Sequence, residues 1–410
     1  MPELFTVVTP QEAWRRLQPH LYPITRVVTV RTEDGLDRVL YEDVVAPSDL
    51  PAFARSSMDG YAVRAEDTYG ASESLPAYLT VVGEVAMGRE AGISLSMGEA
   101  VLIHTGGMLP ANSDAVVMVE NTRCLDAGTL EVYRPVARGE NVIPVGDDMA
   151  EGDVVMEGGS LLQPQGIGGL LGLGITEVAV YDRVKVALIS TGDELVPPEQ
   201  EPALGQIRNT NAYSLSGLAT RIGAVPIRLG IVKDDYESLR RAAEEGRRVA
   251  DLVVMSAGSS VSTRDMTAGV IGSLGEPGVL VHGVSIKPGK PTILAYVDGV
   301  PFFGLPGNPA SAMLTFELFV TPAIYTLGGC KRIPGPCQVQ ARLRRNIPSA
   351  SGREDYAPVR IEEENGELQA DPIFGKSNLL STLIRADGLG IVPLDRSGLA
   401  QGEFVVVRLF

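Results

Sequence analysis

Short hydrophobic runs separated by polar turn residues dominate the segment 75–145. Four runs rich in β-branched residues are bounded by Gly, Pro, Asn and Asp: Leu79–Val82, Ala100–Ile103, Ala115–Val119 and Thr129–Tyr133. Runs of this length between turn residues are typical of β-strands, and no helix of ordinary length fits between them. The pattern therefore predicts a β-rich module in this part of the chain.

Between residues 184 and 320 apolar runs alternate with amphipathic segments. The predicted strands are VKVALIS (184–190), VPIRLGIV (225–232), LVVMSAG (252–258), VLVHGVSI (279–286) and VPFFG (300–304). The spacing of apolar residues predicts helices at 211–223, Tyr236–Val249 and Thr267–Leu274. Strands that are apolar throughout and alternate with helices predict a mostly parallel, doubly wound sheet with helices on both faces.

After about residue 331 the pattern returns to strands, at Gln338–Leu343, Ala357–Ile361 and the terminal EFVVVRLF (403–410). A chain of 410 residues exceeds what one hydrophobic core usually serves, so two to four domains are expected. The predicted fold class is multidomain α/β and β, with the doubly wound sheet in the centre and a small β-barrel-like domain at the C-terminus.

Composition and charge narrow the classes of partner. Apolar residues make up 44% and charged residues 21% of the chain, as in ordinary globular proteins. The net charge of −16 disfavours nucleic acids as partners, because their phosphate backbone needs a basic surface. Small anionic ligands stay open, because a pair of lysines or a helix N-terminus can reverse the potential within one pocket. The longest uncharged windows, 158–176 and 299–316, contain many glycines or prolines, so no membrane helix is expected.

The cysteines, the histidines and the first residues bear on compartment and metal sites. Cys124, Cys330 and Cys337 form no CxxC pair, so neither a disulfide framework nor a structural zinc site is expected. Three widely spaced histidines give little support to a histidine metal centre or a Ser-His-Asp triad. The start MPELFTVVTP does not resemble a secretory signal, and together these features favour a cytoplasmic location.

Polar loops follow the predicted parallel strands. They are STGDEL (190–195), the Lys233-Asp234-Asp235 sequence and SAGSSVSTRD (256–265). The carboxyl ends of parallel strands meet at one edge of a sheet, so these loops are expected to form one site, with the third loop able to present backbone N–H groups to an anion. The alternative interpretation is that each Asp or Ser only caps the helix that follows.

Two further segments add positive potential to the same edge. KPGKP (287–291) places Lys287 and Lys290 around a stiff turn that suits a phosphate or an oxyanion, the alternative being an ordinary solvated turn. In LPGNPAS (305–311), Asn308 at the N-cap and Pro309 at the first helical position begin a helix whose N–H groups can face an anion. Carboxylates of Glu194, Asp234 and Asp265 beside these cations predict a magnesium and phosphate site. There is no GxxxxGK[ST] sequence, which excludes ordinary P-loop chemistry.

The N-terminal half contains one dense polar segment, SSMDGYA (56–62). Asp59 precedes Gly60, and a plain turn explains that pair when the segment is taken alone. The segment from His104 to Gly107 follows a short strand and is a second candidate for an anion-binding turn.

Taken in order, seven segments resemble the molybdopterin molybdotransferase family, which comprises the bacterial MoeA proteins and the E domain of gephyrin. They are SSMDGYA, HTGGMLPANSDAVVMVE (104–120), GDDMAEGDVV (146–155), STGDEL, the loop SAGSSVSTRD, KPGKP and LPGNPAS. The resemblance implies an elongated homodimer of four-domain subunits, in which a domain like molybdopterin adenylyltransferase faces the β-rich domain of the other subunit. It also implies Mg²⁺-dependent insertion of molybdate into adenylylated molybdopterin, with release of AMP and molybdenum cofactor.

The resemblance also implies a division of the chain and a set of site residues. The implied domains are a linker/dimerisation domain (1–25, 46–53 and 145–177), a β-rich lid domain (26–45 and 54–144), a molybdopterin-binding α/β domain (178–328) and a C-terminal β domain (329–410). The implied catalytic residues are Asp59, Thr105, Asp148 and Glu194, and the metal ligands are Asp234 and Asp265. Substrate-binding positions are Ser256, Gly258, Ser259, Ser260, Lys287, Lys290, Pro306, Asn308, Pro309 and Ser377.

The sequence departs from the family pattern at four positions. Ala257 and Ser262 stand where glycines are usual, so a positive φ at either would be strained. Gly283 and Pro358 stand where a lysine and an arginine are usual, and Arg264 or Arg360 are the candidates to replace the lost charge.

Two other functions stay open at this point, a related adenylylation of molybdopterin and a catalytically silent scaffold or sequestering paralogue. The adenylyltransferase and apo-molybdoenzymes are the further partners that the resemblance suggests. It does not distinguish molybdate from tungstate.

Overall fold

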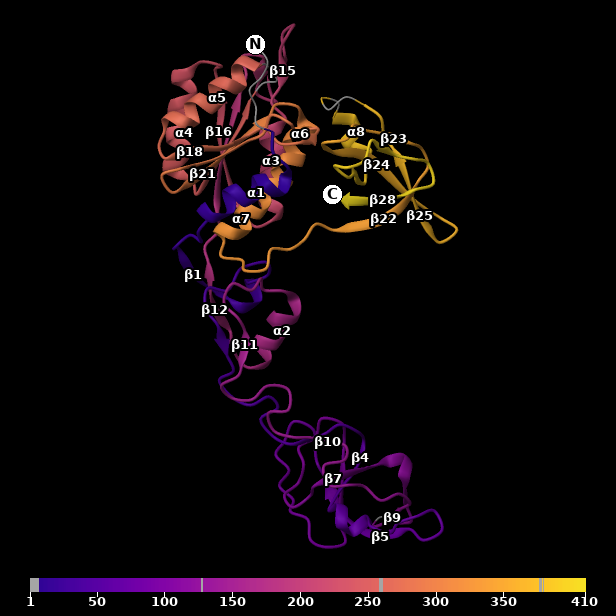
Figure 1. Ribbon diagram of the computed structural model, residues 1–410. Coiled ribbons are helices and arrows are strands. Elements are labelled where there is room, and N and C mark those ends of the chain that lie inside the picture. The colour runs from indigo at the N-terminus through magenta and orange to yellow at the C-terminus, as the bar shows by residue number, and fades with distance from the viewer. Residues whose placement is uncertain (1–6, 127, 258–260, 376–377, 379) are drawn as a thin grey trace.

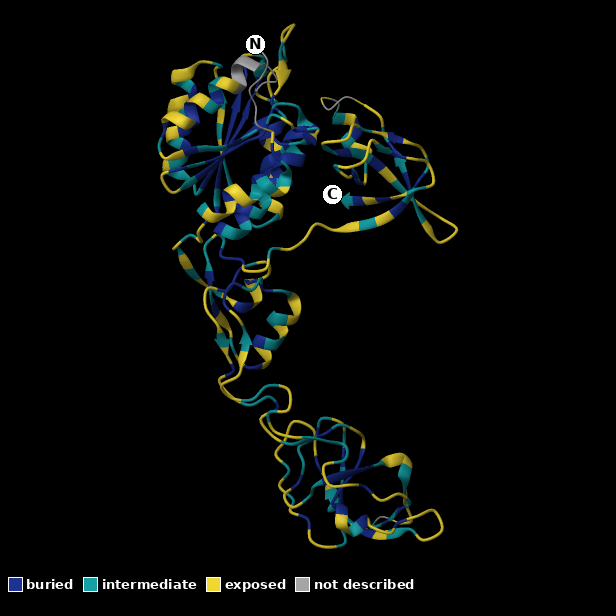
Figure 2. Ribbon diagram, in the orientation of Figure 1, coloured by how far each residue is buried: buried dark blue, intermediate teal, exposed yellow. Residues whose placement is uncertain are grey.

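The computed structural model describes residues 7–410 except 127, 258–260, 376–377 and 379. The chain is elongated (Figure 1), with an α/β unit and a C-terminal barrel at one end, a small unit in the middle and a β-rich unit at the far end. Figure 2 shows that burial is densest in the sheet of the α/β unit. This unit is therefore the best-packed part of the molecule.

The α/β unit is built on a six-stranded sheet of order β16-β13-β17-β21-β20-β18. The first four strands are parallel, β16 (Val225–Val232), β13 (Lys185–Thr191), β17 (Leu252–Ala257) and β21 (Val300–Pro306). The last two pairings are antiparallel: β20 (Ile293–Val297) pairs with β21, and β18 (Pro277–His282) pairs with β20. Every residue of β17 is buried, because helices cover both faces and leave no solvent-facing side.

Helices cover the two faces of this sheet as separate clusters. On one face α3 (Asn211–Arg221), α6 (Pro309–Thr315) and α7 (Thr321–Leu327) pack around Leu215, Phe316 and Phe319. On the other face α4 (Tyr236–Val249) and α5 (Val261–Ser273) pack through Leu239, Ala243, Val270 and Ile271. The doubly wound architecture predicted from the strand and helix alternation is confirmed.

The helical run from α6 through the π-helix η5 (Phe316–Val320) to α7 belongs to the sheet's cover. Its 19 residues, Pro309–Leu327, are long and apolar enough to span a membrane by composition alone. Within the unit, 61% of its apolar window is buried. This is the burial of a core helix, and it accounts for the apolar composition without a membrane.

The first helix, α1 (Pro10–Leu17), also packs on the α/β unit. Thr9 caps it by accepting a hydrogen bond from the Glu12 backbone N–H, and the short η1 (Gln18–His20) follows. Ala13 and Leu17 are fully buried in the core that covers one face of the sheet. The sequence analysis placed 1–25 in the linker domain, and in the structure the apolar stripe of this helix is buried against the α/β core.

The middle unit joins segments that are far apart in the chain. β1 (Val27–Arg31), followed by η2 (Thr32–Asp34), pairs with β12 (Glu177–Tyr181), and β2 (Val44–Val45) pairs with β11 (Val154–Met156). With α2 (Pro164–Gly172) these strands enclose a core that contains Leu40, Leu162, Leu170, Val178 and Val180. Residues 26–45, predicted in the β-rich lid domain, and 178–181, predicted in the α/β domain, thus belong here, because their apolar faces pack together.

The β-rich unit contains one six-stranded sheet of order β7-β4-β6-β5-β9-β8. Its strands are β4 (Gly60–Val63), β5 (Ala77–Glu84), β6 (Glu99–Ile103), β7 (Ala115–Met118), β8 (Thr122–Cys124) and β9 (Thr129–Val132). Beside it β3 (Arg55–Ser56) pairs with β10 (Val142–Ile143), and the short helices are η3 (Ala65–Thr68) and η4 (Val119–Asn121). The prediction of short strands without an ordinary helix is confirmed for the described part of 75–145.

The C-terminal unit is a closed barrel, as the terminal strand pattern predicts. Its strands run β24 (Glu354–Glu364), β25 (Glu367–Pro372), β22 (Gln338–Leu343), β28 (Phe404–Leu409) and β26 (Gly388–Val392), and β26 pairs again with β24. The smaller elements are β23 (Ile347–Pro348), β27 (Gly398–Leu399) and α8 (Leu380–Ile384). The pairing of β26 with β24 closes the barrel. One strand of the α/β unit, β19 (Ile286–Lys287), also pairs with the start of β24.

Gly60 offers a test of the packing in the β-rich unit. A Cβ at this position would lie 2.0 Å from the Val117 carbonyl oxygen and 3.0 Å from Met118 Cα, both of them backbone atoms. Because backbone cannot move aside cheaply, Gly60→Ala should lower the free energy of unfolding by about 3 kcal/mol in a denaturant titration. Gly92→Ala is the control, since a Cβ there meets no heavy atom within 4 Å and should change stability by less than about 0.5 kcal/mol. Equal stability of the two variants would contradict this packing.

Candidate functional site

Two adjoining cavities open at the carboxyl edge of the parallel sheet. The first has a volume of about 770 Å³ and lies between the α/β unit and the barrel. The second has a volume of about 570 Å³ and lies beside the loop that follows β13. Both are lined by Gly307, Asn308 and Asn378, so the turn after β21 stands between them. This is the edge at which ligands bind in doubly wound sheets.

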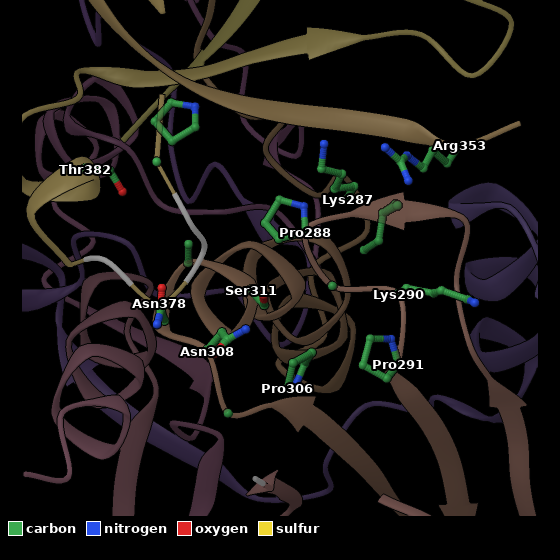
Figure 3. A pocket seen from close by; sticks show the side chains of 16 residues that line it. Lys287, Pro288, Lys290, Pro291, Pro306, Asn308, Ser311, Arg353, Asn378 and Thr382 are labelled. Carbon is green, nitrogen blue, oxygen red and sulfur yellow. The ribbon is translucent and has the colours of Figure 1, made fainter. Parts of the chain in front are cut away.

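The conformation of the turn between β21 and α6 is held by the cap residues of α6 and by a hydrogen bond from α3. Asn308 occupies the N-cap with extended backbone, and Pro309 is the first helical residue, as predicted. The Asn211 side chain donates a hydrogen bond of 2.7 Å to the Gly307 carbonyl oxygen, which holds the turn against α3. Pro306 and Asn308 therefore face the first cavity from a rigid support (Figure 3).

The KPGKP segment forms the opposite wall of the first cavity. Lys287 and Lys290 both line it, and Figure 3 shows the Lys290 side chain extending away from Lys287. Gly289 has φ of 115°, and a Cβ there would come within 2.7 Å of Thr315 Cγ2, so only glycine allows this close turn. The Lys287 ammonium lies 3.3 Å from the Asp355 carboxylate of the barrel. The sequence thus located the two lysines, while the carboxylate partner of Lys287 comes from another unit.

The second cavity collects predicted residues from three neighbouring parallel strands. Glu194 follows β13, Ser256 lies near the end of β17 and Pro309 follows β21, and all three line the cavity. Gly192 has φ of 152°, and a Cβ there would lie 2.7 Å from Glu194 Oε2, so the glycine leaves room for that carboxylate to fold back over the loop. β14 (Leu195–Val196) and β15 (Ile207–Arg208) then pair and carry the chain around the rim.

The two predicted metal ligands lie outside the linings of both cavities. The Asp234 backbone N–H donates to Asp193 Oδ1 over 3.3 Å, and Asp265 is exposed on α5. Within the described ranges no three His, Cys, Asp or Glu side chains converge as they would in a preformed metal centre. Asp234, Asp265 and Glu194 therefore do not form one cluster of carboxylates in this structure.

Asp235 shows that the capping alternative holds for one of these loops. Its side chain accepts a hydrogen bond of 2.9 Å from the Ser238 backbone N–H at the start of α4. That hydrogen bond lowers the pKa of Asp235 below its ordinary value. Asp235 is thus the N-cap of α4.

Asp59, Thr105 and Asp148 lie far from the cavities in this chain. The Thr105 backbone N–H and hydroxyl both donate to Asp59 Oδ1, over 2.8 and 3.1 Å. The backbone N–H of Thr105 is the main cause of the lowered pKa of Asp59, so this exposed carboxylate is ionised at neutral pH. Asp148 is exposed, and its backbone N–H donates to the Leu50 carbonyl oxygen over 3.0 Å. Figure 1 places the β-rich unit at the opposite end of the molecule from the cavities.

Four predicted binding residues, Gly258, Ser259, Ser260 and Ser377, lie outside the described residues. The two departures next to them carry no backbone strain. Ala257 ends β17 and Ser262 lies within the helix α5, and neither has a positive φ. The absence of glycine at these positions therefore does not distort the described backbone.

Several lining residues were missed by the sequence analysis. Arg353, Asn378 and Thr382 reach the first cavity from the barrel, and Asn209, Thr210 and Asn211 line the second. The polar run before α3 was a usable signal for the second group, whereas the barrel residues follow no motif. Pro358 also lines the first cavity, where it offers no charge, while Arg360 is directed at Glu362 over 3.7 Å and is absent from both linings.

Comparison with known proteins covers nearly the whole chain. Family models match as "MoeA N-terminal region (domain I and II)" over 8–174, "Probable molybdopterin binding domain" over 187–326 and "MoeA C-terminal region (domain IV)" over 340–410. A molybdopterin biosynthesis protein of Methanocaldococcus jannaschii is 36% identical over 405 residues, which cover 97% of this chain and 95% of that protein.

Two further relatives agree with this match. A protein of Haemophilus influenzae named molybdopterin molybdenumtransferase is 33% identical over 94% of each chain. The crystal structure of a molybdopterin biosynthesis MoeA protein from Pyrococcus horikoshii OT3 superposes with a TM-score of 0.83 at 33% identity, covering 99% of this chain and 100% of that one. The chain therefore belongs to the MoeA family of molybdopterin molybdenumtransferases.

Proposed function

We propose that this protein inserts molybdate into the dithiolene of adenylylated molybdopterin in a Mg²⁺-dependent reaction that releases AMP and forms molybdenum cofactor. The observation that carries the proposal is the pair of adjoining cavities, which Glu194, Lys287, Lys290 and Asn308 line from three separate segments of the chain. Family membership supports the same chemistry, since relatives are named for molybdenum transfer to molybdopterin. Cytoplasmic location is part of the proposal.

Within the site, positioning and charge do the work. Lys287 and Lys290 of the first cavity and the turn at Asn308 hold the phosphate groups, and Glu194 in the second cavity lies nearer the oxyanion. Ser256, Pro306 and Pro309 complete the walls. Cleavage of the adenylate linkage then needs charge stabilisation and correct orientation rather than a protein nucleophile.

The carboxylates at the sheet edge suit a magnesium ion that arrives with its substrate. Mg²⁺ prefers oxygen ligands and usually takes one or two protein carboxylates, with water and substrate phosphate completing its shell. Asp234, two residues after β16, and Asp265, in helix α5 that follows β17, are the residues proposed to hold it. When bound, the ion offsets phosphate charge.

A second subunit is proposed to complete the cleft. Asp59 and Thr105 are held together in the β-rich unit, at the end of the molecule opposite the cavities (Figure 1). In an elongated homodimer these residues, with Asp148 near the middle unit, can face the partner's cavities. The adenylyltransferase that supplies the substrate and the apo-molybdoenzymes that receive the product are proposed as transient partners.

Purified protein incubated with adenylylated molybdopterin, Mg²⁺ and molybdate tests the reaction. Release of AMP together with molybdenum bound to the pterin dithiolene is expected. Formation of adenylylated molybdopterin from ATP and molybdopterin would instead identify an adenylyltransferase. Absence of both reactions would identify a silent scaffold.

Asp59→Ala should reduce AMP release at least tenfold, because the variant removes an ionised carboxylate proposed to face the partner subunit's cleft. The thermal unfolding midpoint should change little, since Asp59 is exposed. Asp126→Ala is the matched control, because Asp126 is also an exposed carboxylate of the β-rich unit that accepts backbone N–H groups, from Gly128 and Thr129. Wild-type turnover of Asp59→Ala would remove this unit from the mechanism.

Asp234→Asn and Asp265→Asn should raise the Mg²⁺ concentration needed for half-maximal AMP release, because each removes a negative charge while nearly preserving shape. Glu194→Gln should change the magnesium curve less. Asp235→Asn is the control, since asparagine caps α4 as well as aspartate does. If the magnesium titrations of all these variants overlay that of wild type, the proposed metal ligands are wrong.

The active species should be a dimer, because one chain cannot bring Asp59 to its own cavities. Specific activity should fall on dilution in step with the appearance of monomer in sedimentation or light-scattering measurements. A monomer with full specific activity would show that the cleft is complete within one chain.

A further inference from the structure

Two cations that line the first cavity meet on one carboxylate. The Lys287 ammonium lies 3.3 Å from Asp355 Oδ2, and the Arg353 guanidinium contacts the same carboxylate through Nε to Oδ1 at 2.8 Å and through its terminal nitrogen to Oδ2 at 3.4 Å. Lys287 belongs to the α/β unit, whereas Arg353 and Asp355 belong to the barrel side. The cluster therefore spans the two units that enclose the cavity.

Strand pairing fixes this meeting point. β19 and β24 are parallel, and Lys287 stands opposite Asp355 in their register. The Glu354 backbone N–H also donates to the Ser285 carbonyl oxygen over 2.9 Å. The backbones of both units thus hold the ammonium and the carboxylate in reach of each other.

Burial separates the carboxylate from its partners. The Asp355 side chain is only 6% exposed, while those of Lys287 and Arg353 are 57% and 38% exposed. Figure 3 shows Lys287 and Arg353 close together on the same side of the cavity. The carboxylate thus lies behind two cations that remain accessible to a ligand.

The charge of the cluster favours an anion. One carboxylate shared by two cations leaves one positive charge uncompensated beside the cavity. A guanidinium held by two contacts loses rotational freedom before the ligand arrives, so an oxyanion meets a preorganised pair of donors. The donor edge of Arg353 that faces away from Asp355 also suits a bidentate contact, in which two parallel N–H groups donate to two oxygens of one phosphate group.

We propose that Arg353 is a third cation, beside Lys287 and Lys290, for the phosphate groups of the substrate and that Asp355 is the positioning residue that aims Arg353 and Lys287 into the cavity. This inference rests on the proposed function for the nature of the ligand. The proposal also explains how the barrel provides a positive charge although Pro358 stands where the family has an arginine. Arg353 lines the cavity, whereas Arg360 lies 3.7 Å from Glu362 and does not line it.

Isothermal titration of the full-length protein with inorganic pyrophosphate tests the proposal. Asp355→Asn removes a negative charge beside the cavity, so simple electrostatics predicts tighter binding of the anion. A positioning role predicts the opposite, and we expect the affinity to fall about fivefold. Arg353→Lys retains the charge but loses the two-point contact with Asp355, and the same fall is expected. Unchanged or tighter binding in either variant, or a wild type that does not bind pyrophosphate, would overturn the proposal.

Glu317→Gln controls for a general loosening of the barrel. Glu317 is 9% exposed and joins Arg221 of the α/β unit, over 2.7 Å, to Arg408 of the barrel, over 3.2 Å, outside the first cavity. Pyrophosphate affinity of this variant should stay within about twofold of wild type. A fall equal to that of Asp355→Asn would show that barrel docking, and not the aim of the cations, sets the affinity.

The outcome can be separated from that of the proposed reaction. Thermal unfolding and gel filtration verify that each variant is folded before titration. If wild type releases no AMP from adenylylated molybdopterin but the pyrophosphate pattern holds, the proposed reaction fails and the role of Asp355 stands. If AMP release is seen and the pyrophosphate pattern fails, the proposed reaction stands and the role of Asp355 is wrong.

Discussion

The burial of both faces of the parallel strands is the constraint on which the rest of this molecule depends. β17 and β21 are buried along nearly their whole length, with one helical cluster around Phe316 and another around Val270. With both faces covered, a ligand can approach the parallel strands at the edge formed by their carboxyl ends, where the two adjoining cavities open. The loops of that edge therefore carry the polar residues and the two cavities.

The C-terminal barrel turns this edge into an enclosed site. The barrel contacts the α/β unit through the pairing of β19 with β24 and through two ion pairs. Each unit supplies the buried carboxylate of one ion pair and the cation of the other. Glu317 of the α/β unit receives Arg408 from the barrel, and Asp355 of the barrel receives Lys287 from the α/β unit. Removing one partner from such a pair leaves a buried charge uncompensated, so the arrangement favours one orientation of the barrel over others.

In the β-rich unit at the far end of the molecule, the predicted catalytic carboxylate is held by contacts within that unit alone. Asp59 is organised by its own neighbourhood, with both the N–H and the hydroxyl of Thr105 donating to one oxygen. Gly60 follows Asp59 at the start of β4, where a Cβ would collide with the Val117 carbonyl oxygen. The glycine of the Asp-Gly pair is therefore required by strand packing and not only by a turn. The elongated middle unit then keeps this ionised group away from the chain's own cavities (Figure 1).

The sequence alone determined the parts of the structure that depend on local pattern. Apolar runs and helical spacing were enough for the four parallel strands of the doubly wound sheet, the short strands of 75–145 and the terminal barrel strands, because period and turn residues act over a few neighbouring positions. The strand β20 (Ile293–Val297) of the same sheet was not predicted. The same reasoning located Lys287, Asn308 and Glu194, since the loops after parallel strands must meet at one edge.

Only the tertiary structure decided which distant segments share a core or a site. Val27–Arg31 pairs with Glu177–Tyr181, and α1 packs on the α/β sheet, although alternation within each segment fits several partners equally well. Arg353 and Asp355 reach Lys287 from a strand nearly 70 residues away along the chain, where no motif marks them. A strand's pattern fixes which face is apolar, but the choice of partner depends on shape and charge that exist only after the units have packed.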